Sequence, residues 1–87
     1  MISRSEGISW ARRVKVRHLE SFLVLDEAGT LTAAATRLHM TQSAMSHWLA
    51  ELENGVGTPL VVRGRKLQLT PAGHLLKRLA INVLGDI

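Results

Sequence analysis

The chain has 87 residues, carries a formal net charge of +4 and contains no cysteine. Its length limits it to one small domain with a thin core, and the lack of cysteine excludes a disulfide framework and a thiolate metal site. No apolar run approaches transmembrane length and no signal-type apolar segment opens the chain, so we expect a cytoplasmic protein without a membrane partner.

The basic balance favours an anionic partner, either nucleic acid or a membrane surface, and of the two we expect nucleic acid. No Asp or Glu lies between Ala28 and Ala50, and none lies between Asn54 and Gly85. Much of the chain therefore offers no repulsion to phosphate. Residues 1–15 add a basic cluster, which we interpret either as a flexible N-terminal extension or as a basic arm that contacts the DNA backbone.

Two short helices are predicted next. Apolar residues at helical spacing indicate a first helix over 16–28, with Gly29 as its C-cap. After a turn at residues 30–31, Thr32 is expected to cap a second helix over 33–38.

A third helix begins after Thr41, which is a good N-cap, and it runs over residues 42–53 with an end near Gly55 and Gly57. One face is apolar. The opposite face carries short or polar side chains and no acid, namely Gln42, Ser43, Ser46, His47 and Ala50. Such a face suits the DNA major groove, where Gln and Ser can read base edges, so this element is predicted to be the recognition helix of a helix-turn-helix. The alternative is an amphipathic surface helix with a solvated face.

Residues 60–69 are interpreted as a β-hairpin around Gly64, with Leu60 and Val62 on one face of its first strand. Its tip is basic and carries Arg63, Arg65 and Lys66. A basic hairpin after a recognition helix is a wing, and we favour contact with phosphate or the minor groove over a merely solvated tip.

Thr70 followed by Pro71 is a strong helix start, and it predicts a last helix from about Pro71 to Gly85. The apolar side of this helix consists of Leu76, Leu79, Ala80, Val83 and Leu84. That side is wide for so small a domain. One part should cover the core, and the exposed remainder suggests a second copy as partner.

With these elements in place, residues 16–84 resemble the DNA-binding domain of LysR-type transcriptional regulators. The motifs that carry the resemblance, in the family's order, are AAATRLHMTQSAMSH at 33–47, the pair Leu52–Glu53, the G-x-P-L step at 57–60 and LTPAG at 69–73. The TQSAMSH segment is similar to the branch that regulates methionine biosynthesis.

The resemblance implies a mainly α fold with a small hairpin, in which a winged helix-turn-helix over 16–70 is followed by a dimerisation helix over 71–87. It also implies a homodimer, whose two last helices pair antiparallel, on an inverted-repeat operator in double-stranded DNA. By position, the base-facing residues are Gln42, Ser43, Ser46 and His47. Thr32 and Thr41 match backbone-contact positions, and Arg63 matches the wing arginine.

The sequence departs from the family's pattern in several places. His47 stands where Arg is usual, Trp48 replaces a polar residue, and Val61 replaces the usual Phe at the root of a wing that is one residue shorter. The shorter wing leaves the roles of Arg65 and Lys66 open. The family's effector-binding domain is missing, so we expect no small-molecule effector for this chain, which is either a DNA-binding fragment or a short relative.

Enzymatic and cofactor chemistry is not expected. The four histidines have no metal-ligand spacing and no cysteine to join them. Ser46 and His47 are adjacent on a helix and point apart, so they cannot form a nucleophile–base pair. The remaining alternative to DNA binding is a protein-interaction module with a helix-turn-helix shape.

Overall fold

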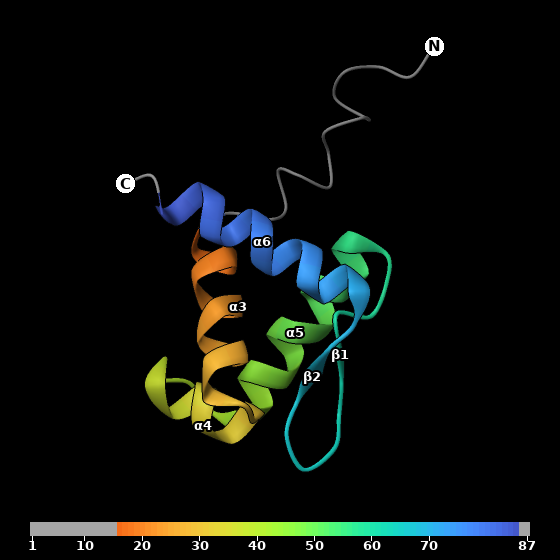
Figure 1. Ribbon diagram of the computed structural model, residues 1–87. Helices are drawn as coiled ribbons and strands as arrows, with labels where there is room; N and C mark the ends of the chain where they lie inside the picture. The colour runs from red at the N-terminus through yellow and green to blue at the C-terminus, as the bar shows by residue number, and fades with distance from the viewer. Residues whose placement is uncertain (1–15, 86–87) are drawn as a thin grey trace.

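The computed structural model describes residues 16–85, so the basic cluster within residues 1–15 lies outside the described part (Figure 1). In chain order the elements are α3 (Val16–Ala28), α4 (Leu31–Arg37), α5 (Gln42–Val56), β1 (Val61–Val62), β2 (Gln68–Leu69) and α6 (Pro71–Gly85). The expected mainly α fold with one small hairpin is confirmed. None of the helices within residues 16–85 is long and apolar enough to cross a lipid bilayer.

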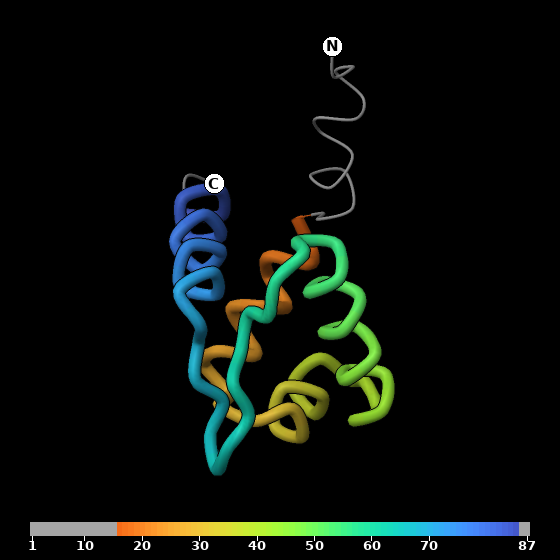
Figure 2. Tube along the Cα trace, turned by 90° about the vertical axis from the view of Figure 1, so that its right-hand side faces the viewer, coloured from red at the N-terminus to blue at the C-terminus, as the bar shows by residue number. Residues whose placement is uncertain are grey.

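Helix α3 is the centre of the packing, since it contacts both α4 and α6, while α4 packs against α5. In Figure 1, α6 crosses one end of the domain, and in both Figure 1 and Figure 2 α4, the start of α5 and the tip of the hairpin gather at the other end. The largest fully buried side chains are Phe22 and Leu25 of α3, Met45 and Leu49 of α5, and Leu60 just before β1. The small residues Ala34 and Ala35 of α4 are buried as well and let it approach closely.

The start of α4 differs from the prediction. The helix begins at Leu31, and Thr30, not Thr32, is its N-cap, with the Thr30 hydroxyl accepting a hydrogen bond from Ala33 N–H at 3.1 Å. The physical reason is burial: Leu31 is only 8% exposed, and as the first residue of α4 it packs against the core. Thr32 lies one residue inside the helix and is exposed.

The predicted N-caps of α5 and α6 are confirmed. The Thr41 hydroxyl accepts from Ala44 N–H at 3.0 Å at the start of α5, and the Thr70 hydroxyl accepts from Gly73 N–H at 3.0 Å at the start of α6. Helix α5 ends at Val56, near Gly55 and Gly57 as predicted, and its C-cap Gly57 has a φ of 92°, the left-handed conformation that glycine adopts readily. Trp48 lies half-buried on α5 with its ring stacked on that of His18 in α3, at a centroid distance of 6.3 Å.

The hairpin does not alternate as predicted. Leu60 and Val61 are both buried, whereas Val62 is 58% exposed, so Leu60 and Val62 do not share a buried face. Strand β1 begins only at Val61 and pairs antiparallel with β2 in the register Val61 with Leu69 and Val62 with Gln68. Leu60 precedes the strand, and its backbone is held against the start of α6. A β-carbon on Gly73 would collide with the carbonyl oxygen of Leu60, so this close approach requires glycine.

Candidate nucleic-acid interface

The outer face of α5 is built on a buried stripe. Met45, Leu49 and Leu52 point into the core, and this fixes the rotation of the helix about its own axis. The four side chains predicted to read bases are therefore left outside the core: Gln42, Ser43 and His47 are exposed, and Ser46 is half-buried. The structure brings these side chains together on the same surface, as a reading face requires.

One of these residues, His47, is already paired with an acidic side chain. Glu51 Oε1 lies 2.9 Å from His47 Nε2, one helical turn away, and both side chains are exposed. The acid-free face therefore ends at Ala50, and one ring nitrogen of His47 already has a partner. The i,i+4 spacing of His47 and Glu51 in the sequence is the signal that indicates this contact.

The two threonines predicted to contact the DNA backbone lie at the starts of α4 and α5. Both Thr32 and Thr41 are exposed. The Thr41 hydroxyl already serves as the cap of α5, and the carbonyl oxygen of Thr32 accepts a hydrogen bond from the Thr36 hydroxyl at 3.1 Å. Each residue sits where helix N–H groups face outward, which favours a nearby anion.

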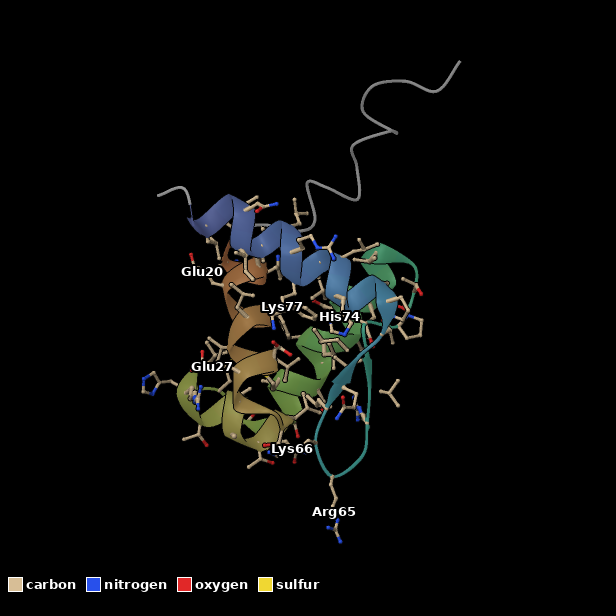
Figure 3. All side chains as sticks on the ribbon, viewed as in Figure 1. Glu20, Glu27, Arg65, Lys66, His74 and Lys77 are labelled. Atoms are coloured by element: carbon tan, nitrogen blue, oxygen red, sulfur yellow. The ribbon has the colours of Figure 1, made fainter. Side chains whose placement is uncertain are left out.

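The basic residues of the wing do not share one environment. Arg63, Arg65 and Lys66 are all exposed. Figure 3 shows Arg65 at the hairpin tip, pointing away from the domain, while Lys66 lies back toward the α3–α4 turn. There Lys66 Cδ lies 3.9 Å from the position that a β-carbon on Gly29 would occupy, and Leu67 N–H donates to the Gly29 carbonyl at 2.8 Å. The return arm of the wing is therefore anchored beside the start of α4.

The root of the wing is joined to α5 by a residue whose role the sequence analysis missed. Glu53 Oε2 accepts a hydrogen bond from Leu60 N–H at 2.7 Å and a longer one from Val61 N–H at 3.4 Å. The Glu53 carbonyl also accepts from Gly57 N–H at 2.7 Å. The Leu52–Glu53 pair was part of the resemblance, but nothing in its spacing indicates a contact seven residues along the chain.

The residues predicted for dimerisation divide into two groups. Leu76 and Ala80 are buried in the core of this same domain, and Leu84 is half-buried against that core, so assigning Leu76 and Ala80 to a dimer interface was wrong. Leu79 and Val83 remain 45% and 40% exposed. They lie on one flank of α6, and Leu79 is part of the lining of a groove of about 210 Å³, together with Val56, Ala72, Leu75 and Leu76.

Ion pairs hold the flanks of the domain. Lys77 Nζ lies 2.7 Å from Asp26 Oδ2 and connects α6 to α3, and Arg37 lies 3.4 Å from Glu27 and connects α4 to α3. These pairs engage two acidic residues of α3. Over residues 16–85, histidines and acidic side chains form no group that could hold a metal ion.

A three-helix core with two successive capped helices, an outward polar face on the second and a following basic hairpin defines a winged helix-turn-helix protein. Residues 16–74 match the family described as bacterial regulatory helix-turn-helix protein, lysR family. The chain belongs to this family.

Individual relatives agree with this assignment. The HTH-type transcriptional regulator MetR of Escherichia coli is 44% identical over 75 residues, which are 85% of this chain and 24% of that protein. CatR of Pseudomonas putida is 42% identical over 71 residues, or 82% of this chain and 25% of that protein. The chain thus spans about a quarter of the length of these curated relatives.

Solved structures resemble the fold closely. The DNA-binding domain of BenM in complex with catB site 1 DNA superposes with a TM-score of 0.75 at 33% identity, covering 83% of this chain and 78% of that one. DarR of Vibrio fischeri in complex with DNA gives a TM-score of 0.77 at 35% identity, covering 84% of this chain and 25% of that one.

Proposed function

We propose that this chain binds double-stranded DNA in a sequence-specific way and serves transcriptional regulation as the DNA-binding domain of a LysR-type regulator. Helix α5 enters the major groove, and the wing at residues 60–69 contacts the backbone or the minor groove. The observation that carries the proposal is that the start of α5 and the hairpin tip lie at the same end of the domain (Figure 2), and that the polar residues of the first and the basic residues of the second are exposed. This arrangement lets one duplex contact both elements.

Within this proposal each group of residues has a role. Gln42, Ser43, Ser46 and His47 read base edges, because amide, hydroxyl and imidazole groups can donate to or accept from the major-groove pattern. Thr32, Thr41, Arg63, Arg65 and Lys66 hold the phosphate backbone or the minor groove. BenM and DarR, whose folds this chain shares, were solved in complex with DNA, and this supports DNA as the partner.

The proposed partner arrangement is a homodimer on an inverted repeat. The exposed flank of α6 with Leu79 and Val83 supports it, since two copies could cover this strip by pairing their last helices. The role is non-enzymatic and belongs to the bacterial cytoplasm, where the chromosome is. The identity to MetR supports the methionine-regulator branch, but CatR is nearly as similar, so the proposal does not extend to a particular set of genes.

The experiment that tests this function is selection of bound fragments from a pool of random double-stranded DNA, followed by titration of the best selected duplex and a scrambled duplex of equal length. We expect an enriched sequence with two related half-sites and a clear preference for it over the scrambled duplex. Equal affinity for the two duplexes, or no enrichment, would contradict sequence-specific binding.

A further inference from the structure

The junction between the recognition helix and the wing depends on one acidic side chain. Glu53 lies in the last turns of α5, and the wing root begins seven residues later at Leu60. A negative charge on a DNA-binding domain opposes binding, because it repels phosphate. Its presence therefore needs a reason within the protein.

The contacts of Glu53 supply that reason. Its carboxylate accepts the Leu60 and Val61 N–H groups, and its carbonyl accepts Gly57 N–H, so Glu53 closes the loop between α5 and β1 from both its side chain and its backbone. Hydrogen bonds from N–H groups to a carboxylate are charge-assisted and stronger than neutral ones. The Leu60 carbonyl is held in turn by Thr70 N–H at 3.0 Å, so the peptide groups on both sides of Leu60 are fixed.

The hydrogen bonds of Glu53 also affect the position of Arg63 on the wing. Arg63 follows β1 directly, two residues after the Val61 amide that Glu53 holds. The two strands have only two residues each, so their pairing alone gives the wing little stiffness. The return arm is anchored at Leu67, whose N–H donates to the Gly29 carbonyl, so the direction of the first arm, which carries Arg63, depends on the Leu60–Val61 root.

We propose that Glu53 is a positioning residue for DNA binding: its carboxylate fixes the wing root to the recognition helix, so that the wing arginines meet the backbone while α5 occupies the groove. This inference rests on the proposed function and goes beyond it, because it assigns a gain in DNA affinity to an acidic side chain that touches no DNA. Counting charges alone predicts the opposite, namely that removing Glu53 raises the affinity for DNA.

The test uses the full 87-residue chain and a random-sequence duplex as the probe. Glu53→Ala removes the acceptor, and Glu53→Gln keeps one side-chain oxygen that can still accept from Leu60. Glu20→Ala is the matched control, because Glu20 is an exposed acid on α3 and its loss changes the net charge equally. Figure 3 shows Glu20 near the end of the domain that α6 crosses, far from the hairpin tip.

Binding is measured as log affinity against log salt. We expect Glu53→Ala to weaken binding and to lower the magnitude of the slope by about one or more, as the loss of a phosphate contact does. Glu53→Gln should restore most of the slope, and Glu20→Ala should bind at least as tightly as the natural chain. The double variant Glu53→Ala with Arg63→Ala should bind no more weakly than Glu53→Ala alone. Losses that multiply in the double variant would overturn the proposal.

Amide hydrogen exchange gives a second readout that needs no DNA. Glu53→Ala should lose protection at residues 60–69 while the amides of α3 keep theirs. Unchanged protection at the wing, or an equal loss throughout the domain, would overturn the positioning role. If the natural chain bound neither a selected nor a random duplex, the proposed function would fail, and exchange at the wing would still decide whether Glu53 holds the root.

Discussion

Two threonines separated by one residue occupy different positions at the start of α4. The Thr30 hydroxyl accepts the Ala33 N–H, whereas Thr32 lies inside the helix with an exposed side chain. We expect Thr30→Ala to lower the free energy of unfolding by about 1 kcal/mol, because it leaves an N-terminal N–H group without its cap. Thr32→Ala is the matched control and should have little effect or stabilise slightly, since alanine favours a helix interior.

Urea unfolding of the two variants beside the natural chain measures this difference. If Thr32→Ala lowered the free energy of unfolding more than Thr30→Ala, Thr32 would be the N-cap, as the sequence pattern suggested. The sequence could not decide between them, because either threonine can precede a helix of alanines. The burial of Leu31 against the core decides, and burial depends on residues far along the chain.

Side-chain contacts could be predicted from the sequence only where they depend on residues close together in the chain. The capping roles of Thr41 and Thr70 were predictable, because a cap depends on local sequence alone. The pairing of His47 with Glu51 is also local and could be expected from its spacing. The hydrogen bond from Leu60 to Glu53 could not be expected, because it requires the loop to return to α5.

Helix α6 has three faces around its axis, which lie in different environments. Leu76 and Ala80 face the core, Leu79 and Val83 lie exposed on one flank, and Ile81 lies exposed on the other flank near His74, Lys77 and Arg78. No Asp or Glu lies on this helix, so a Glu substitution introduces its first negative charge.

We predict that Leu79→Glu combined with Val83→Glu converts a dimer into a monomer and weakens binding to a duplex with two half-sites. The physical reason is the cost of burying a carboxylate in an apolar interface. Ile81→Glu is the control: it is 50% exposed but lies on the other flank, and it should leave the dimer intact. Sedimentation of the three proteins measures the state. A monomeric natural chain at high micromolar concentration, or an equal loss from Ile81→Glu, would contradict this interface.

The apolar width of α6 was evident from the sequence, but its division was not. The helical period of about 3.6 residues identifies a wide apolar side in the sequence. Only the packing of α6 against α3 shows which part of that side is buried in the core. The hairpin is a similar case. Its existence and basic tip were predictable, whereas the burial of Leu60 and Val61 together depends on the close approach of Gly73.

The whole molecule places its basic wing tip and the start of α5 at one end and α6 toward the other (Figure 1). Exposed Arg63 and Arg65 lie on that wing, and no acid lies between Asn54 and Gly85. We therefore expect DNA affinity to fall steeply between low and physiological salt for any duplex sequence, as phosphate contacts release counterions. Titrations over a salt series measure the slope. A nearly flat plot would mean that phosphate contacts are few.

The central claim is a division of labour, in which α5 reads the sequence and the wing holds the backbone. Gln42 is exposed in the first turn of α5, and its amide can donate and accept together, as adenine in the major groove requires. Arg63 is exposed on the wing. Neither residue belongs to the buried core, so alanine at either position should leave the fold intact.

The most direct measurement is titration of Gln42→Ala and Arg63→Ala, each against the best selected duplex and a scrambled duplex at one fixed salt concentration. Gln42→Ala should cost about 1–3 kcal/mol on the selected duplex and far less on the scrambled one. Arg63→Ala should weaken both duplexes by similar amounts, because phosphate contact carries no sequence information. If Gln42→Ala instead lowered both affinities equally while Arg63→Ala spared the scrambled duplex, the roles of the two elements would be reversed.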